Sequence, residues 1–324
     1  MDAERTSNGG DLAVFASGLG KHFGSVVALD GIDLRVPRGA CFGVLGPNGA
    51  GKTTTVAILA TLLRPDSGTA RVLGLDVESQ RSDVRREIGI VFQEPSLDRE
   101  LTAREHLDLH ARLYHLDRRL ERVRRALDEA GLGPDADRPV RGFSGGMKRR
   151  LELARGMLHR PRVLFLDEPT LGLDVAARAA VWERLRELRA SGDLTVLLTT
   201  HSMEEADALC DSLAILDRGR VVASGSSEAL KRELGGDIVT LELERIATVE
   251  ETLGLVAGVR SVVREADSRA RVRVTVEDGS RRLVSLLDAA RPFGVVEVSL
   301  ERPTLEHVFR KHAGRAFERH EGGA

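Results

Sequence analysis

A glycine-rich segment of the chain matches the phosphate-loop pattern G-x-x-x-x-G-K-[ST] in full: Gly46-Pro47-Asn48-Gly49-Ala50-Gly51-Lys52-Thr53. Glycines let backbone N–H groups curl round a phosphate without Cβ clashes, and a helix start adds partial positive charge. Lys52 would reach the β- and γ-phosphates, the Thr53 hydroxyl would hold Mg²⁺, and Thr54 could donate to the neighbouring phosphate. The segment predicts nucleotide binding, against the alternative of an ordinary glycine-rich turn with an exposed lysine.

A second pair of glycines stands at the start of a predicted helix, where Ser144 precedes Gly145 and Gly146 and the helix runs to about His159. Serine is a good N-cap, and paired glycines expose backbone N–H groups at a helix start. The segment therefore indicates a second anion site, separate from the first. A merely capped helix would account for the same residues.

Two acids, Asp167 and Glu168, end an apolar run that begins after Arg162. Buried parallel strands have this character, and active groups sit at their C-terminal ends. Asp167 is placed to hold the magnesium shell and Glu168 to polarise an attacking water, whereas two acids that simply close a strand are the alternative. His201 follows the next apolar strand, which favours a functional role although a lone histidine is more often structural.

Weaker candidates lie outside these segments. Phe23 precedes the phosphate loop and could stack on a nucleobase, or it could be an ordinary core or edge-strand phenylalanine. His106 and His110 have the i, i+4 spacing of a chelating pair, but no third ligand is evident, so we expect them to face solvent. The arginine-rich run 118–125 is typical of a solvated helix face.

The elements that must position these residues alternate between strands and helices. Apolar runs predict strands at 41–45, 69–73, 88–92, 162–168 and 194–199, and helical spacing predicts helices at 54–63, 102–132, 144–159, 175–189 and 203–210. Ahead of the phosphate loop, alternating segments predict antiparallel strands with turns at Gly24 and at Asp30-Gly31. A hairpin at 213–223 and a helix at 226–234 close this part of an α/β fold.

Gly235-Gly236 marks a predicted boundary, so we divide the chain into a disordered start (1–10), a large domain (11–235), an accessory domain (236–315) and a disordered tail (316–324). Residues 238–300 follow the order strand, helix, strand, strand, helix, strand, with a last helix at 304–313. This order suggests a small ferredoxin-like α+β domain. It holds no catalytic cluster, so dimer support, regulation and a passive structural role all stay open.

Composition sets broad limits on the class of protein. The 324 residues are 42% hydrophobic, which supports a globular core, and the formal charge of −2 argues against a general nucleic-acid-binding or acidic-membrane-binding surface. We expect no signal peptide in the polar residues 1–10, and no apolar run approaches the roughly 20 residues that span a bilayer. Cys41 and Cys210 are predicted to be buried thiols in a reducing compartment, not a disulfide or a metal pair.

Residues 12–235 resemble the ATP-binding-cassette (ABC) ATPases, because several motifs occur together in the order of that family. They are the phosphate loop at Gly46–Thr53, the Q-loop at Gln93, the signature at Ser144–Met147, the acid strand ending in Asp167 and Glu168, the D-loop at Asp174 and the switch histidine His201. The resemblance implies a P-loop NTPase fold with a mixed sheet core, an antiparallel β subdomain and a helical subdomain.

The resemblance also implies roles for single residues. Ser144, Gly145 and Gly146 of one copy would close on the γ-phosphate of ATP held by Lys52 of a second copy, which explains the second anion site. Gln93 would touch Mg²⁺ and sense the partner chain. His201 would contact the γ-phosphate and help to position Glu168. The resemblance further implies that Phe23 stacks on the base and that Asp174 lies at the nucleotide. The chain departs from the family at Met147, which stands where the signature more commonly has glutamine.

Within the family, residues 143–150 and 303–309 look most like the ATPases of daunorubicin-resistance exporters. That likeness implies a Mg²⁺-dependent ATPase that forms a homodimer, sits at the cytoplasmic face of the cell membrane, powers a separate permease chain and binds no nucleic acid.

One alternative is a soluble ABC ATPase that acts on nucleic acid or ribosomes. Translation-type members carry two cassettes, whereas this chain has one phosphate loop. Repair-type members insert long coiled coils between the phosphate loop and the signature, whereas here Ser144 stands only 92 positions after Lys52. A non-hydrolysing scaffold ranks last, because Glu168 and His201 are both present.

Overall fold

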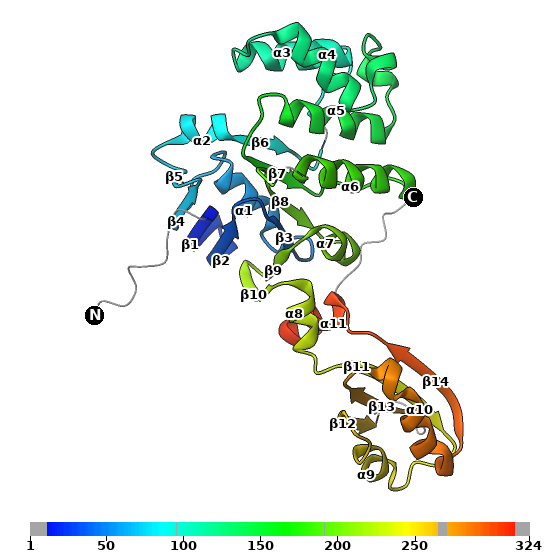
Figure 1. Cartoon of the computed structure of the whole chain (residues 1–324). Coiled ribbons are helices and arrows are strands. Elements are labelled where there is room, and N and C mark those ends of the chain that lie inside the picture. The colour runs from blue at the N-terminus through cyan, green and yellow to red at the C-terminus, as the bar shows by residue number, and fades with distance from the viewer. Residues whose placement is uncertain (1–11, 95, 191, 265–270, 315–324) are drawn as a thin grey trace. The chain divides into compact units, whose positions relative to one another are not determined.

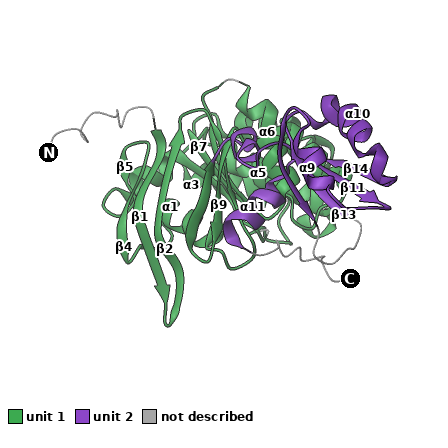
Figure 2. Cartoon of the chain, turned by 90° about the horizontal axis from the view of Figure 1, so that it is seen from below, with its two compact units in different colours: residues 1–224, 318–324 green, residues 225–317 purple. Residues whose placement is uncertain are grey.

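A computed structural model describes residues 12–94, 96–190, 192–264 and 271–314. The predicted disordered segments 1–10 and 316–324 lie outside the described residues. The described residues fall into two compact units that divide between Ser224 and Gly225 (Figures 1 and 2). The boundary predicted from Gly235-Gly236 falls shortly after this division, so the helix predicted at 226–234 is grouped with the second unit.

The first unit is built on a six-stranded sheet of order β10-β9-β3-β8-β7-β6. Its strands are β3 (Cys41–Leu45), β6 (Ile88–Val91), β7 (Val163–Asp167), β8 (Thr195–Thr200), β9 (Ser212–Asp217) and β10 (Arg220–Gly225). The neighbouring strands in the stretch β9-β3-β8-β7-β6 of this order run parallel. Every residue of β3, β7 and β8 is buried. Continuous apolar runs form such strands because helices cover both faces, and their C-terminal ends meet at one edge.

A second, antiparallel sheet of order β2-β1-β4-β5 contains β1 (Leu12–Phe23), β2 (Val26–Pro37), β4 (Ser67–Val72) and β5 (Leu75–Asp76). The turn predicted at Gly24 is confirmed, but the turn predicted at Asp30-Gly31 is wrong. β2 runs through these residues, and its register against β1 shifts because Leu19 pairs with Ile32 while Gly20 pairs with Asp30. Gly31, at φ 77°, makes a bulge, which the same local sequence allows.

The helices of the first unit are α1 (Lys52–Leu59), α2 (Arg81–Glu87), α3 (Ala103–Leu113), α4 (Arg119–Glu129), α5 (Gly145–Met157), α6 (Val175–Arg189) and α7 (Met203–Leu209), with 3₁₀ turns at Gly133–Asp135 and Val140–Gly142. The single helix predicted at 102–132 is two, because His115 and Arg118 take positive φ and break it. A capping box between Thr102 and Glu105 starts α3. α3, α4 and α5 share a separate hydrophobic cluster, which forms the helical subdomain (Figure 1).

The second unit contains β11 (Asp237–Leu243), β12 (Val259–Arg264), β13 (Arg271–Val276), β14 (Val295–Glu301), and helices α8 (Ser227–Arg232), α9 (Val249–Gly254), α10 (Gly279–Ala290) and α11 (Leu305–Ala313), with a 3₁₀ turn at Arg291–Phe293. Its sheet has the order β12-β13-β11-β14 with antiparallel neighbours. The predicted order of elements is confirmed and is that of a split β-α-β fold. Alternate residues of β11 and β13 pack against α9 and α10 in one core.

Candidate functional site

The phosphate loop connects β3 to α1, so the motif has the strand-turn-helix context that the sequence predicted. Gly51 caps α1 at φ 103°, a backbone conformation that suits glycine. A Cβ on Gly51 would lie 2.6 Å from the carbonyl oxygen of Ala28, and one on Gly46 would lie 2.5 Å from that of Leu216. Close packing against backbone on both sides therefore requires these two glycines.

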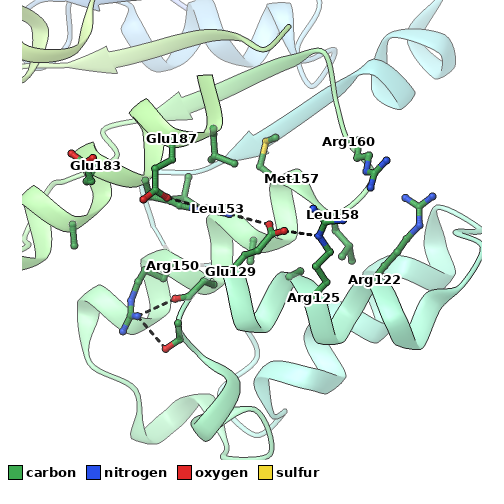
Figure 3. Close-up of a pocket in the computed structure, with 17 residues that line it drawn as sticks. Arg122, Arg125, Glu129, Arg150, Leu153, Met157, Leu158, Arg160, Glu183 and Glu187 are labelled. Carbon is green, nitrogen blue, oxygen red and sulfur yellow. Dashed lines mark hydrogen bonds and ion pairs between the residues drawn. The ribbon is translucent and has the colours of Figure 1, made fainter. Parts of the chain in front are cut away.

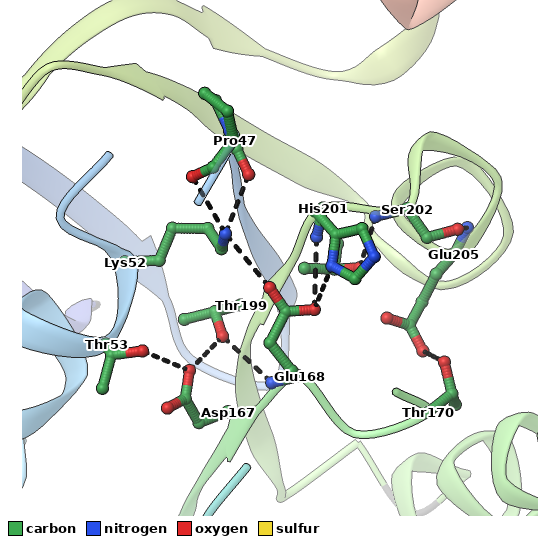
Figure 4. A network of polar contacts seen from close by, with 12 residues as sticks. Pro47, Lys52, Thr53, Asp167, Glu168, Thr170, Thr199, His201, Ser202 and Glu205 are labelled. Atoms are coloured by element: carbon green, nitrogen blue, oxygen red, sulfur yellow. Dashed lines mark hydrogen bonds and ion pairs between the residues drawn. The ribbon is translucent and has the colours of Figure 1, made fainter. Parts of the chain in front are cut away.

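Lys52 turns its ammonium group back over the loop (Figure 4). Its Nζ donates to the carbonyl oxygens of Gly46, at 2.8 Å, and Pro47, at 3.2 Å, and it forms an ion pair with Oε1 of Glu168 at 3.1 Å. The side chains of Lys52 and Glu168 are both buried, at 6% and 5% exposure. A buried charge needs such partners, and the pairing joins the phosphate loop to the acid at the end of β7.

Asp167 accepts two hydroxyl hydrogen bonds at Oδ1, from Thr53 at 3.2 Å and from Thr199 at 2.5 Å (Figure 4). Thr53 stands at the start of α1, and Thr199 lies in β8 beside the end of β7. Hydroxyl and carboxylate oxygens are the ligand types that Mg²⁺ prefers, so Thr53 and Asp167 fit the predicted magnesium site. Thr199 was not among the predicted site residues, although its place near the end of a buried strand could have indicated it.

Glu168 and His201 form the other half of the site. Nδ1 of His201 lies 2.8 Å from Oε2 of Glu168, and the His201 backbone N–H donates to the same oxygen at 3.3 Å. Burial by itself would raise the pKa of Glu168, but the hydrogen bond from His201 and the charge of Lys52 outweigh it and hold that pKa below its usual value. The Glu168 hydrogen bond in turn raises the pKa of His201 against the opposing effect of burial. Glu168 is therefore an ionised carboxylate that can act as a base.

The backbone of Glu168 is in the left-handed region, at φ 48°. This conformation is strained for a residue with a side chain, and surrounding bonds must hold it. The Glu168 N–H donates to both the carbonyl oxygen and Oγ1 of Thr199, each at 3.1 Å. Two residues farther on, Thr170 donates to the buried carboxylate of Glu205 at 2.7 Å, which also accepts from Trp182 at 3.1 Å. The sequence offered no signal for this support.

The other predicted site residues lie outside this network. Phe23 is 49% exposed in β1, which lies between β2 and β4, so it is neither a core residue nor on an edge strand. The Lys21 ammonium group lies 5.7 Å from the centre of its ring. Gln93 is exposed just after β6, and within the described residues it joins none of the hydrogen bonds between Lys52, Asp167 and Glu168.

Ser144 and Asp174 are both exposed and both cap helices. Ser144 Oγ accepts from the Met147 N–H at 3.2 Å at the start of α5, and Asp174 Oδ1 accepts from the Ala177 N–H at 2.8 Å at the start of α6. The two helix starts are adjacent, since a Cβ on Gly146 would lie 3.1 Å from that of Ala177. The glycine turn is thus an exposed helix N-terminus within the chain, apart from the phosphate loop's network.

The expectation that His106 and His110 face solvent is wrong. His106 is buried, with Nε2 2.8 Å from the carbonyl oxygen of Asp98. The His110 ring lies 4.7 Å from that of Tyr114, which stacks on His159 at 4.0 Å, and burial lowers the pKa of His110 to about 4. Across the described ranges, no group of three or more acidic, histidine or cysteine side chains could hold a metal. Both cysteines are free thiols; Cys41 is buried, as predicted, whereas Cys210 is only partly buried.

A cavity of about 480 Å³ lies among α4, α5 and α6 (Figure 3). Its lining includes Arg125, Glu129, Met157 and Glu187, but none of the predicted site residues. The predicted chemistry therefore belongs to the sheet edge and not to this cavity. In the part of the chain that the structure describes, every helix is too short or too polar to cross a bilayer.

Known proteins match both units of the chain. A model of the ABC transporter family matches residues 29–171, and a model of the C-terminal domain of DrrA1-3-like ATP-binding proteins matches residues 225–313. The daunorubicin resistance ATP-binding protein DrrA3 of Streptomyces coeruleorubidus is 44% identical over 303 residues, which cover 92% of this chain and 95% of that protein.

Two further matches cover about two thirds of the chain. The Nod factor export ATP-binding protein I of Ralstonia nicotianae is 46% identical over 225 residues, covering 68% of this chain and 70% of that protein. A solved dimeric ATP-binding cassette in a post-hydrolysis state, bound to ADP and Pi, is 25% identical with a TM-score of 0.61, and covers 66% of this chain and 98% of that chain.

Proposed function

This chain belongs to the ABC transporter family and is an ATP-binding, ATP-hydrolysing subunit of the exporter type; from that membership we propose that it powers a separate membrane permease for drugs or antibiotics. The observation that carries the proposal is the meeting of Lys52, Asp167 and Glu168 at one edge of the parallel sheet. Two segments far apart in sequence, the phosphate loop and the end of β7, supply a phosphate-binding cation, a metal-binding acid and a base there.

We assign the phosphate oxygens of ATP to the backbone amides of Gly46–Thr53, with Thr54 and the Lys52 ammonium group. Thr53 and Asp167 would hold Mg²⁺, with Gln93 as a further ligand, and the bound ion would supply charge that neutralises the phosphates. Glu168 would take the proton of the attacking water, and His201 would hold Glu168 in place beside the γ-phosphate. Phe23, exposed at the tip of β1, would stack on the base.

A second copy of the chain would complete each site. The turn Ser144–Gly146, exposed at Ser144 and Gly145, starts a helix whose N-terminal amides suit an anion, but within the described residues it lies outside the network of its own chain's Lys52. We therefore propose that it binds the γ-phosphate held by the partner copy, with Asp174 at the same interface. A dimeric arrangement has a precedent in the solved cassette dimer that matches this chain.

The exporter assignment follows relatives whose names state resistance to daunorubicin and export of Nod factor. Drug or antibiotic cargo, a separate permease and a position at the cytoplasmic face of the membrane are the finer parts of the proposal. The alternative, a soluble ATPase that acts on nucleic acid or ribosomes, has no support from these relatives.

The test is to purify the full chain from its own cells after mild cross-linking and to measure Mg²⁺-dependent ATP hydrolysis. We expect a multi-span membrane protein in the cross-linked complex and hydrolysis that stops in Lys52→Ala. Recovery with ribosomes or DNA instead, or hydrolysis that Lys52→Ala leaves unchanged, would contradict the proposal.

A further inference from the structure

Arg149 binds the backbone of the catalytic turn, residues 167–169, from within α5. The residue is 5% exposed, Nε donates to the Pro169 carbonyl oxygen at 2.6 Å, and Nη2 donates to those of Asp167 at 3.2 Å and Glu168 at 3.1 Å. One side chain therefore contacts all three carbonyls of the turn that carries the metal-binding acid and the base. The strained backbone of Glu168 lies in the middle of these contacts.

The same guanidinium also reaches the segment around Gln93. Nη1 of Arg149 donates to the Phe92 carbonyl oxygen at 2.7 Å and to Oε2 of Glu152 at 3.1 Å. Glu152 is fully buried one turn farther along α5, and its Oε1 accepts from the Ser96 N–H at 3.0 Å. The buried ion pair of Arg149 and Glu152 therefore binds the backbone at Phe92 and at Ser96, on either side of Gln93 in the sequence.

All five N–H donors of Arg149 have an acceptor: four backbone carbonyls and one carboxylate oxygen. A planar fork fixes the relative positions of these acceptors, whereas a lysine has three donors on a flexible stem and cannot. Burial lowers the pKa of Arg149, and the charge of Glu152 opposes that effect. Every donor of the guanidinium is therefore used to hold the turn 167–169, the Phe92 carbonyl group or Glu152.

We infer that Arg149 is a positioning residue that ties the geometry of Glu168 to the helix that begins at Ser144. α5 runs without a break from Gly145 to Met157, so a phosphate that engages the glycine turn moves or holds Arg149 with it. Engagement of the partner copy's nucleotide would then set the catalytic turn of the same chain. This inference rests on the proposed function, because it requires the composite site of the dimer.

The chain has a built-in probe of this turn, its single tryptophan. Trp182 donates to the Glu205 oxygen that also accepts from Thr170, so the Glu205 carboxylate links the indole to the residue that directly follows the turn. A non-hydrolysable ATP analogue with Mg²⁺ should therefore change Trp182 emission in the wild-type full chain on dimerisation. In Arg149→Gln that change should disappear.

The decisive measurement compares binding with turnover. For Arg149→Gln we expect ATP affinity and ATP-dependent dimerisation to stay within about threefold of wild type while kcat falls roughly 100-fold, as a catalytic group displaced by about 1 Å would cause. Arg149→Lys should not rescue kcat. Arg150→Gln is the matched control, because Arg150 lies on the same helix and donates, among the described residues, to the carbonyl oxygens of Ala130 and Gly131 and not to the turn.

Two results would overturn the inference. The first is an Arg149→Gln chain with the kcat and the Trp182 response of the wild type. The second is an Arg149→Gln chain that loses ATP binding together with kcat, which is the result that a purely structural role would give. If Arg149→Gln does not fold, Arg149→Lys is judged by the same criteria. Failure of the wild-type chain itself to hydrolyse ATP or dimerise would instead contradict the proposed function, and would be seen before any variant is compared.

Discussion

The imidazole Nδ1 of His201 lies 2.8 Å from Oε2 of Glu168, while Oε1 of the same carboxylate faces the Lys52 ammonium group at 3.1 Å. The two carboxylate oxygens of Glu168 are therefore held by an ammonium group and an imidazole from two other segments. This arrangement keeps the carboxylate ionised and fixes its direction, so we expect turnover to depend most on Glu168.

Glu168→Gln keeps the shape of the side chain but removes the base. A general base contributes roughly 10²- to 10⁴-fold to a rate, so kcat should fall by about that factor while the ATP dissociation constant stays within about threefold. Steady-state hydrolysis and equilibrium ATP binding measure the two quantities. Glu183→Gln, an exposed acid paired with Arg186 on α6, is the control and should hydrolyse ATP normally. A Glu168→Gln chain that turns over at the wild-type rate would exclude the assigned role.

The shifted pKa values of Glu168 and His201 predict how stability depends on pH. The raised His201 pKa gives stability that is complete below the unfolded value of 6.5 and is lost as pH rises through the folded value. The lowered Glu168 pKa gives stability that is present above 4.5 and is lost as pH falls through the folded value. The difference in Tm between wild type and His201→Gln should therefore be largest between pH 4.5 and 6.5.

Thermal unfolding of both chains across pH 4 to 9 checks this expectation. His22→Gln, which replaces an exposed histidine, should follow the wild type. A His201→Gln difference that is the same at every pH would show that the pair contributes no titration-linked stability.

Thr199→Val removes the hydroxyl that donates to Asp167 while it keeps the volume of the side chain. Loss of a group that orients a metal ligand typically weakens metal affinity about 10- to 100-fold, so the Mg²⁺ concentration for half-maximal hydrolysis should rise by about that factor. A Mg²⁺ titration of ATPase activity measures it. Thr200→Val, next along β8, should leave that concentration unchanged, because the Thr200 hydroxyl accepts from the Ser202 N–H and, within the described residues, donates no hydrogen bond to Asp167. An unchanged requirement in Thr199→Val would remove Thr199 from the site.

Glu152→Ala should destabilise the first unit strongly. Glu152 is fully buried against Arg149, and removal of one partner from a buried ion pair typically costs about 3–5 kcal/mol because the other charge stays buried. Urea unfolding measures the free energy of unfolding. The exposed pair Arg86–Asp83 gives the comparison, since Asp83→Ala should cost less than about 1 kcal/mol. Equal losses in the two variants would contradict the burial argument.

Much of the site could be predicted from the sequence, because each of its parts is local. Apolar runs that end in polar residues mark buried parallel strands, so the sequence predicts that the phosphate loop, Asp167, Glu168 and His201 lie at strand ends. The rule that such ends share one edge brought them together correctly. Gln93 is predicted from the resemblance alone, and the Ser144 turn from its serine cap and paired glycines; in one copy of the chain neither joins the hydrogen bonds among Lys52, Asp167 and Glu168 that the described residues form.

Other features depend on packing that no local pattern carries. Turns and bulges favour the same residue types, so the sequence predicts a turn at Asp30-Gly31 where the structure has a bulge within β2. The break between α3 and α4 falls at His115 and Arg118, which have no helix-ending signal of their own but take positive φ. Arg149 has no local signal of its role, because four of its five acceptors come from two distant segments, at Phe92 and at residues 167–169, that only the fold brings together.

The most direct test of the account is the mass of the chain in solution with Mg²⁺ and ATP. In the Glu168→Gln background, which keeps ATP uncleaved, light scattering should show dimers that hold two ATP per two chains. Adding Ser144→Arg should leave a monomer that still binds ATP with an unchanged affinity, because that turn serves the partner's nucleotide. A dimer that Ser144→Arg does not weaken, or ATP held by single copies throughout, would contradict the shared site.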